Sequence, residues 1–448
     1  MSGLWLSDGF GLFIEMRGDT MLVNEVTSLS CLPGLRAVRE PTSAPDAEVF
    51  RSDDGVIRIS PGSSAQRKWV HLEGSVSAIG LHRVAKRPAT CDRRVADTPE
   101  ANYDVFVETF KENFATSAQR HVDWRTADSV FRPRISPTTS PTELFGVFRD
   151  MLAPLHDPHS SIEAPPLKLA FRGRRIGSDG LGPTDRPRVN EVIASRYVEG
   201  ALRRYCNGQI EFGFLRSSER QLPDTVPGSH TNRHIGYLRI NSFTRFTTDG
   251  DFQHELDTLE SALDQMLRDA GHMSGLVIDV RINPGGSDAF GLMIASHLTA
   301  RDYVAYTVAA RDGTRDPSGF TPPQPIRVHA STQAKFLGPT VVLTSAHTVS
   351  AAETFVLALM QREPHITRIG AATQGAFSDI LGRMLPNGWS FGLSNELYRT
   401  PSGRSFEGAG VPVDIEVQMF NPGDVSRGTD VGLDRAIQVL RGTRTGNE

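Results

Sequence analysis

The sequence predicts an α/β protein with a small β-rich module at its N-terminus and a helical subdomain before the main domain. Short apolar runs separated by turn residues fill the first part of the chain, and aromatic residues at helical spacing follow them. Strands then alternate with helices, which is typical of a partly parallel sheet covered by helices. We therefore expect four successive parts, at residues 1–95, 96–165, 166–232 and 233–448.

Composition places the chain among globular proteins and excludes several function classes. Hydrophobic residues make up 38% and charged residues 22% of the 448 residues, which suffices for a core and for solubility. The formal net charge of −4 argues against a nucleic-acid-binding protein, which usually carries a basic face. No apolar run reaches the ~20 residues of a membrane span, and residues 1–20 lack the pattern of a signal peptide. We therefore expect neither a nucleic-acid partner nor membrane association.

The three cysteines, Cys31, Cys91 and Cys206, lie far apart in the chain and match neither a metal site nor a disulfide-rich pattern. A reducing compartment fits this cysteine usage best. We therefore expect a cytoplasmic protein. No pattern in the sequence implies a metal ion or an organic cofactor.

The N-terminal module contains strand-like runs such as residues 11–16 and 20–23, each bounded by Gly or Asp. Residues 37–66 hold several Pro, Ser, Asp and Gly and are expected to form a loop or a loosely ordered insertion. The polar residues 92–100 are expected to be a linker. The module should therefore be β-rich, with a long loop inside it.

Helical periodicity marks the next part of the chain. Aromatic residues at spacings of three and four predict a first helix with one aromatic face, made of Tyr103, Phe106, Phe110 and Phe114. A second helix is expected over residues 141–155, where Ser140 and Glu143 can form a capping box and Pro141 suits the first turn. The polar turn 156–161 follows this helix.

Strands and helices alternate clearly in the last part of the chain. Short apolar runs predict strands at 235–240, 275–280 and 341–344. Apolar residues at spacings of three and four predict helices at 251–269, 351–361 and 430–441. The strands at 275–280 and 341–344 should be buried neighbours, which would bring the turns that follow them to the same end of the sheet.

These two turns carry groups suited to acyl-transfer chemistry. Gly285 and Gly286 let the backbone approach a ligand and expose N–H groups for an oxyanion, although an ordinary turn would also use them. Ser350 lies where strand, turn and helix meet, so the helix N-terminus would favour an oxyanion beside it. Ser350 and Glu353 also match a capping box, so a structural role remains open.

Two further residues have suitable chemistry in polar turns. His159 follows the second predicted helix and could act as a general base at neutral pH. His156 and His159 together make only a weak zinc pattern, because no third ligand accompanies them. Glu407 lies in a glycine-rich turn and could face a site or occupy a hairpin tip. A solvated or structurally satisfied side chain is the alternative for each histidine.

The order of these motifs resembles the tail-specific, or C-terminal-processing, serine protease family. The matching segments are Asp-Val-Arg-Ile-Asn-Pro-Gly-Gly at 279–286, Ser-Ala-Ala-Glu at 350–353, Ile-Gly-Ala-Ala-Thr-Gln-Gly at 369–375 and Glu-Gly-Ala-Gly-Val at 407–411. The resemblance covers about residues 100–440 and implies a catalytic core of the crotonase-like ββα superhelix type. It implies Ser350 as the nucleophile, with Gly285 or Gly286 and the Ala351 N–H forming the oxyanion hole.

The sequence departs from the tail-processing members in a way that points to one branch of the family. Ala376 stands where those members carry a lysine base, so the sequence resembles the branch of the tricorn protease core and the interphotoreceptor retinoid-binding protein. That resemblance implies His159 as the base and Glu407 as its support, although Pro158 replaces the serine before the tricorn histidine. Residues 166–232 look too short for the complete PDZ domain that many relatives carry.

The leading hypothesis is a serine peptidase that acts on peptides or unfolded protein segments. The main alternative is a non-catalytic protein that binds an apolar ligand on the same fold, as the retinoid-binding relative does. An acyl-thioester enzyme of the crotonase type ranks last, because it leaves the turns of Ser350 and Glu407 unexplained. A homo-oligomer is compatible with the sequence.

Overall fold

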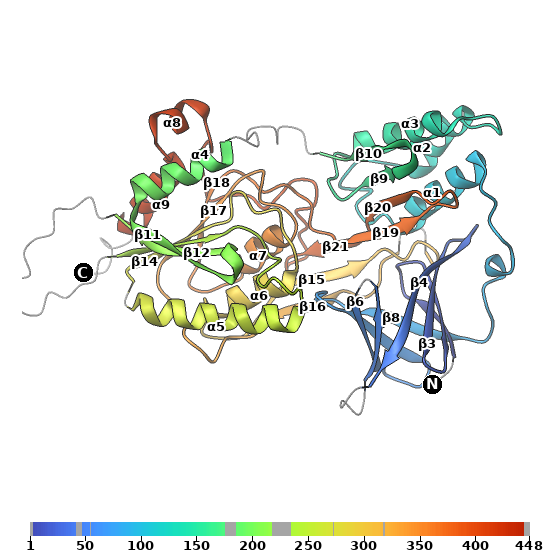
Figure 1. Ribbon diagram of the computed structural model, residues 1–448, viewed down its shortest axis with the longest axis horizontal. Coiled ribbons are helices and arrows are strands. Elements are labelled where there is room, and N and C mark those ends of the chain that lie inside the picture. The colour runs from blue at the N-terminus through green and yellow to red at the C-terminus, as the bar shows by residue number, and fades with distance from the viewer. Residues whose placement is uncertain are drawn as a thin grey trace, which may run out of the picture. The chain divides into compact units, whose positions relative to one another are not determined.

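A computed structural model describes residues 3–41, 47–53, 55–174, 185–216, 234–271, 273–316 and 319–442 (Figure 1). The chain divides into two compact units, each assembled from three stretches of sequence. The first unit comprises Met1–Arg175, Thr307–Ile326 and Ser378–Gly408, and the second comprises Ile176–Tyr306, Arg327–Phe377 and Ala409–Glu448. The four continuous parts expected from the sequence stay a prediction.

A closed β-barrel, blue in Figure 1, forms the N-terminal part of the first unit. Its strands follow chain order: β1 Gly3–Ser7, β2 Leu12–Arg17, β3 Thr20–Val26, β4 Cys31–Glu40, β5 Glu48–Ser52, β6 Gly55–Pro61, β7 Arg67–Leu72 and β8 Ile79–Val84. Antiparallel pairing of β1 with β8 closes the barrel and leaves no free sheet edge. Its buried cluster includes Met16, Met21, Phe50 and Leu81. The predicted β-rich module is confirmed.

The predicted loop at residues 37–66 is wrong, because strands β4 to β6 run through most of this segment. Phe50, Ile57 and Ile59 alternate with exposed polar residues, so each strand turns one face to the barrel core. Polar residues on the outer face gave these strands the composition of a loop. Residues 42–46 and 54 of the predicted loop lie outside the described residues.

Cys31 and Cys91 form a disulfide bond, and their Cα atoms are 4.8 Å apart. The sequence interpretation, which found no disulfide pattern among distant cysteines, is therefore wrong. The two residues are 60 positions apart in the chain, but the folded barrel brings the start of β4 to the short helix η1 (Ala89–Asp92). The expected cytoplasmic location stays a prediction and loses the support that the cysteines gave it.

Helices follow the barrel in the first unit and pack against a small sheet. The helical elements are α1 Pro99–Asn113, α2 Trp124–Phe131, η2 Arg132–Arg134, α3 Pro141–Leu152, η3 Ala153–Leu155 and η4 Pro165–Leu167. The sheet has the order β10-β9-β20-β19, with β9 Ser161–Ala164, β10 Leu169–Arg172, β19 Ile380–Met384 and β20 Ser390–Ser394. Both predicted helices are confirmed, and Ser140 and Glu143 form the predicted capping box.

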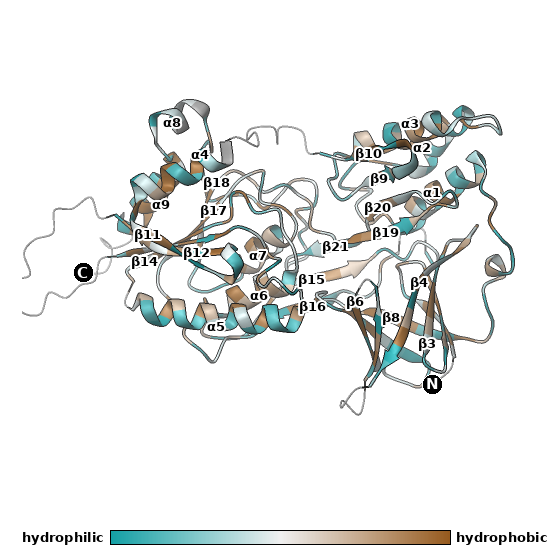
Figure 2. Cartoon of the chain, viewed as in Figure 1, coloured by the Kyte–Doolittle hydropathy of each residue, from teal (hydrophilic) through white to brown (hydrophobic). Residues whose placement is uncertain are grey.

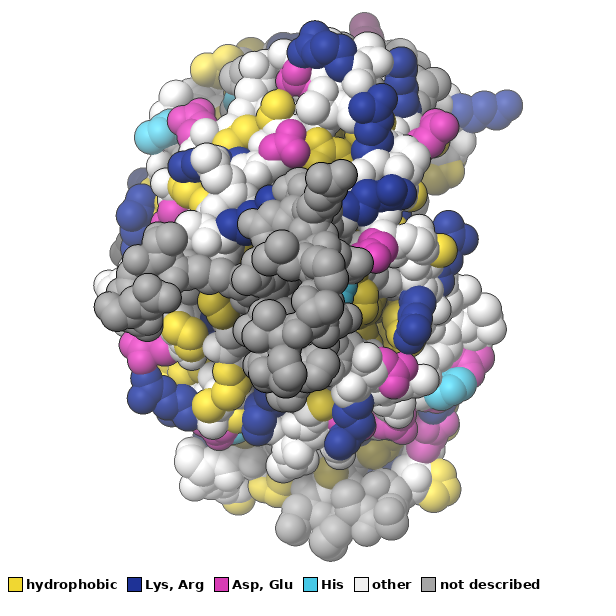
Figure 3. All heavy atoms as spheres, turned by 90° about the vertical axis from the view of Figure 1, so that its left-hand side faces the viewer, with side chains coloured by type: hydrophobic (Ala, Val, Ile, Leu, Met, Phe, Trp, Pro, Cys, Tyr) yellow, Lys and Arg dark blue, Asp and Glu magenta, His cyan; other side chains and the backbone are white. Residues whose placement is uncertain are grey.

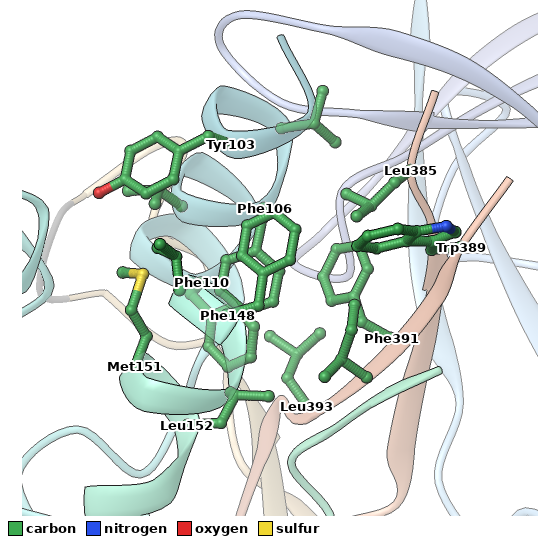
Figure 4. Close-up of a cluster of buried hydrophobic side chains, with 14 of the residues drawn as sticks. Tyr103, Phe106, Phe110, Phe148, Met151, Leu152, Leu385, Trp389, Phe391 and Leu393 are labelled. Carbon is green, nitrogen blue, oxygen red and sulfur yellow. The ribbon is translucent and has the colours of Figure 1, made fainter. Parts of the chain in front are cut away.

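An aromatic core holds these helices to strand β20 (Figure 4). The rings of Phe106 in α1 and Phe148 in α3 stack with centroids 4.3 Å apart. Phe391 in β20 lies 5.1 Å from the Phe106 ring, and Trp389 meets Phe148 edge to face. Pairs of this kind contribute about 0.5–1.5 kcal/mol beyond the area they bury. The core therefore joins segments that are almost 300 residues apart in the chain.

A further sheet has the order β16-β15-β21, with β15 Tyr303–Ala310, β16 Gln324–Val328 and β21 Glu396–Arg399. Residues 307–310 of β15 pair antiparallel with β21 inside the first unit.

The second unit is built on a mixed sheet in the order β11-β12-β13-β14-β17-β18-β22. Its strands are β11 Val198–Tyr205, β12 Ile210–Leu215, β13 Ile235–Ile240, β14 Gly275–Asp279, β17 Thr340–Thr344, β18 Thr367–Gly370 and β22 Ile415–Glu416. From β13 onward neighbouring strands are parallel. The predicted α/β class is therefore confirmed, and β14 and β17 are buried neighbours whose following turns share one end of the sheet.

Helices cover both faces of this sheet. They are α4 Asp185–Val192, η5 Ile193–Tyr197, η6 Cys206–Gly208, α5 Phe252–Ala270, α6 Asp288–Ser296, α7 Ala351–Leu359, α8 Pro422–Arg427 and α9 Val431–Gly442. Buried residues of α4 and α9 pack on one face, and Figure 1 shows α5, α6 and α7 on the other. Figure 2 shows apolar central strands and a mixed, amphipathic α5. Among the described helices, none is long and apolar enough to cross a membrane.

The disulfide generates a first prediction. Thiol titration of the unfolded, unreduced protein should find one free cysteine, Cys206, because Cys31 and Cys91 are bonded to each other. Replacing both Cys31 and Cys91 by Ser should lower the free energy of unfolding by about 2–4 kcal/mol, since the cross-link restricts the unfolded chain. Denaturant unfolding with and without a reductant measures this loss. Three free thiols, or an unchanged unfolding midpoint in the variant, would contradict the prediction.

Candidate active site

Ser350 lies in the second unit at the point where the chain leaves β17 and enters α7. Its backbone has a φ of 57° and a ψ of −124°, a conformation that residues with a side chain rarely adopt. Ser350 and Glu353 form the capping box that the sequence predicts. A capping serine needs only extended backbone, whereas this conformation costs of order 1–3 kcal/mol. Strain of this kind is typical of a functional position.

The Glu353 carboxylate holds this turn in place through hydrogen bonds. It is fully buried and accepts hydrogen bonds from the Ser350 N–H at 3.1 Å, the Thr373 hydroxyl at 2.6 Å and the N–H groups of Gly375 and Ala376 at 2.6 and 2.9 Å. Burial raises the pKa of Glu353, and these four donors oppose that effect. Glu353 therefore joins the helix start to residues 373–376 as well as capping the helix, a role that its capping-box position in the sequence did not reveal.

Gly285 and Gly286 lie directly against the Ser350 turn and have to be glycines. Gly285 has a φ of 98°, and a Cβ added to it would lie 2.7 Å from the Cβ of Ser350. Gly286 has a φ of 141°, and a Cβ there would lie 2.0 Å from the carbonyl oxygen of Phe243. The lack of a side chain therefore lets the chain at Gly285 touch the Ser350 turn and lets the chain at Gly286 lie against the backbone of Phe243.

The N–H groups of these turns differ in what they bind. The Gly285 N–H donates to the Asn283 side chain at 2.9 Å, which leaves it unable to serve a ligand in this arrangement. In the described part of the chain, the N–H groups of Gly286 and Ala351 donate to no acceptor. Gly286 and Ala351 are therefore the pair with free donors, and Gly285 serves to bring the turns together.

His159 lies in the first unit, in the turn between η3 and β9. Its side chain is buried, and its Nδ1 has no hydrogen-bond partner among the described residues. Burial lowers the pKa of His159, and the nearby Asp157 carboxylate offsets part of that effect. Asp157 accepts the His159 backbone N–H at 3.0 Å and the hydroxyls of Ser160 and Ser394 at 2.7 and 2.9 Å. The turn of His159 is thus rigidly held.

Glu407 also lies in the first unit, and Arg120 connects it to the turn of His159. The Arg120 guanidinium donates to the Glu407 carboxylate at 3.1 Å and to the His156 carbonyl at 3.0 Å, and it lies 3.6 Å from Asp157. The three charged side chains are at most 4% exposed. Arg120 was missed in the sequence, because nothing in its local pattern distinguishes it from the many other arginines.

The structure therefore gathers the predicted residues in two sets. Ser350, Ala351, Gly285 and Gly286 meet in the second unit, while His159 and Glu407 are linked through Arg120 in the first. The catalytic roles expected for them stay predictions. Within the described ranges, no group of His, Cys, Asp or Glu side chains is arranged to hold a metal ion.

Comparison with known families and proteins gives consistent matches. Residues 234–417 match the model of peptidase family S41, and residues 96–153 match that of the tricorn protease C1 domain. The chain is 26% identical over 226 residues to a carboxyl-terminal-processing protease of Synechocystis sp., a match that covers 50% of this chain and 46% of that one. It is 28% identical over 214 residues to a carboxy-terminal-processing protease of Bartonella bacilliformis, over 48% and 45% of the two chains. The chain thus spans about half the length of the curated relatives it matches.

Solved structures with low sequence identity share the fold. A candidate peptidase from Parabacteroides merdae has a TM-score of 0.61 at 23% identity, over 77% of this chain and 97% of that chain. Mature CPAF in complex with lactacystin has a TM-score of 0.53 at 12% identity, over 78% of this chain and 98% of that chain. Together with the family matches, these findings confirm the resemblance drawn from the order of the motifs.

The buried position of Arg120 generates a second prediction. Arg120→Met should lower the free energy of unfolding by about 3–5 kcal/mol, because it leaves the carboxylates of Glu407 and Asp157 buried without their cation. Arg134→Met is the matched control, since its ion pair with Asp150 is exposed and should matter by less than about 1 kcal/mol. Urea unfolding followed by tryptophan fluorescence measures both changes. An equal effect of the two substitutions would show that Arg120 does not hold these carboxylates.

Proposed function

We propose that this chain is a member of the tail-specific serine protease family S41 and hydrolyses peptide bonds in peptides or unfolded protein segments. The observation that supports this best is the Ser350 turn. There a strained serine lies at a helix N-terminus beside two N–H groups that donate to no acceptor among the residues that the structure describes. A structural turn would need neither the strain nor the free donors.

In the proposed mechanism, the Ser350 hydroxyl attacks the scissile carbonyl carbon while His159 accepts its proton. The N–H groups of Gly286 and Ala351 hold the oxyanion that forms on the carbonyl oxygen. His159 returns the proton to the leaving amine, and a water molecule then hydrolyses the acyl ester by the same steps. Glu407 supports the charged imidazolium, and Arg120 positions Glu407 relative to the turn of His159.

The sheet of the second unit also supports the finer fold assignment made from the resemblance. Strands β13, β14, β17 and β18 are parallel, and α6 and α7 follow the two turns that contain Gly286 and Ser350. We include in the proposal that this unit is a crotonase-like ββα superhelix. Backbone donors after neighbouring strands would then form the oxyanion hole.

The alternative of a non-catalytic protein for an apolar ligand rests on Ala376, which is buried where tail-processing relatives carry a lysine base. Ala376 donates its N–H to Glu353 and so takes part in the support of the Ser350 turn. The large cavity of the second unit has charged side chains on its floor, which suits an apolar ligand poorly. The peptidase proposal is therefore the better supported of the two.

The assignment of the nucleophile and base generates a third prediction. A fluorophosphonate probe should label the intact protein and not Ser350→Ala, because only an activated serine reacts with it. His159→Ala should lower peptide turnover by a factor on the order of 10² or more, since Ser350 then lacks its general base. Lys335→Ala is the control and should change turnover little. Equal labelling of the intact protein and Ser350→Ala would refute the mechanism. An inactive Lys335→Ala variant together with an active His159→Ala variant would also refute it.

The buried position of His159 generates a fourth prediction, which concerns pH. Burial lowers the pKa of His159 below its ordinary value of 6.5, so the imidazole stays neutral and able to accept a proton at pH values below 6.5. Turnover should therefore persist below that value and fall only as the pH drops through the lowered pKa. The pH profile of kcat/KM for a peptide substrate tests this. An acidic limb centred above 6.5 would contradict the assignment of His159 as the base.

A further inference from the structure

A cavity of about 1060 Å³ lies within the second unit and has no part in the mechanism above. It lies on the sheet face that α4 and α9 cover, and its lining comes from α4, β11, β12, β13 and the chain that follows β14. Ile282 and Pro284, which lead directly to Gly285, belong to this lining. The cavity therefore borders the segment of chain that leads to the candidate oxyanion donor Gly286.

A row of charged side chains crosses the floor of the cavity. Arg204, Glu211, Arg239 and Asp279 are paired in register on β11, β12, β13 and β14, so they lie side by side on one face of the sheet. The side chains of Arg239 and Glu211 are only 11% and 6% exposed. Charges in such a position are costly to bury, and a sheet face that only packed against helices would be apolar. The row therefore indicates a polar ligand.

The side-chain oxygens on the floor of the cavity already accept hydrogen bonds from arginines of the protein. The Glu211 carboxylate accepts from Arg204 at 3.2 Å and from Arg239 at 2.6 Å, and the Asn190 side-chain oxygen accepts from Arg239 at 2.6 Å. Asp279 is likewise occupied, because Arg281 donates to it at 2.9 and 2.6 Å. The carboxylates of this floor are therefore not available to pair with a cationic ligand.

Arg245 adds a cation to the wall of this cavity. It lies in the chain after β13, and among the described residues no carboxylate is within ion-pair distance of its guanidinium. The lining holds four arginines, Arg204, Arg239, Arg245 and Arg281, and three carboxylates, those of Glu191, Glu211 and Asp279, and Arg281 is also paired with Asp430 from outside the lining. Glu191 is exposed, while Glu211 and Asp279 are paired with arginine. Among the described residues, Arg245 is thus the lining arginine without a carboxylate partner, and it favours a ligand group that carries negative charge.

This preference belongs to the cavity and not to a broad surface. Figure 3 shows basic, acidic and hydrophobic side chains interspersed over the described part of one face of the molecule. A surface that binds polyanions would instead carry a continuous basic patch. A small anionic group that fits the cavity is therefore the better match.

The cavity connects directly to the turn of Gly285 and Gly286. Ser242 lines the cavity and donates its hydroxyl to the Gly285 carbonyl at 3.2 Å, and the Phe243 N–H donates to the same carbonyl at 2.9 Å. We propose that a peptide whose scissile carbonyl reaches the Gly286 N–H places a carboxylate in this cavity, so that cleavage occurs preferentially beside an acidic group; this inference rests on the proposed peptidase function.

Binding to the full-length Ser350→Ala variant tests the inference without turnover. Three fluorescent peptides of one sequence are compared by anisotropy: one with Asp and an amidated C-terminus, one with Asn and an amidated C-terminus, and one with Asn and a free C-terminal carboxylate. At least one carboxylate peptide should bind about fivefold more tightly than the uncharged one, as expected for a partly exposed charge-assisted contact. Which of them does so distinguishes a side-chain carboxylate from a C-terminal one.

Substitution of Arg245 identifies the contact. Arg245→Gln in the same background should remove the advantage of the carboxylate peptide, whereas Arg268→Gln, an exposed arginine of α5 outside the cavity, should preserve it. Equal affinity for all three peptides, or an unchanged preference in Arg245→Gln, would overturn the inference.

Cleavage of the same peptides by the intact protein separates this inference from the proposed function. Faster Ser350-dependent cleavage of the preferred carboxylate peptide supports both proposals. Cleavage without any preference for a carboxylate refutes the role of the cavity and leaves the peptidase standing. Carboxylate-selective binding without any cleavage refutes the peptidase and leaves the binding site standing.

Discussion

The candidate active site depends on one buried carboxylate. Glu353 accepts four hydrogen bonds at the start of α7, and three of them come from backbone N–H groups. Each such group would cost about 1–3 kcal/mol if it stayed buried without an acceptor. Glu353 therefore supports both the strained backbone of Ser350 and the segment that ends at Ala376. This carboxylate thereby holds the turn that leads into Ala351, one of the two candidate oxyanion donors.

The first unit uses a buried cation for the same purpose. Arg120 binds the carboxylate of Glu407 and the backbone of the turn that precedes His159, so two loops from distant parts of the chain share one partner. Asp157 holds the same turn from its other side. Buried ionic groups are poor sources of net stability, but they specify geometry when every partner is satisfied. In both units, therefore, a buried charged side chain fixes the geometry of the candidate site residues and adds little net stability to the fold.

The sequence predicted what depends on local pattern and missed what depends on three-dimensional pairing. Strands β14 and β17 and the turns after them were predictable, because continuous apolar runs mark strands buried on both faces. The strands within residues 37–66 were not, since barrel strands are polar on their outer face and resemble loops. Neither the Cys31–Cys91 bond nor the role of Arg120 could be predicted, because each partner is identified only by the fold. The charged row of the cavity likewise requires the register of four strands.

The interleaving of the two units bears on how the chain is made. The aromatic core of the first unit joins Phe106 to Phe391, so it cannot close until most of the second unit has left the ribosome. The barrel closes through the pairing of β1 with β8 and needs only the first 84 residues. Domains generally fold as units in the order of synthesis. The barrel can therefore form early, whereas the apolar faces of α1 and α3 stay exposed until strand β20 has been synthesised. These faces are therefore open to aggregation or to chaperone binding during synthesis.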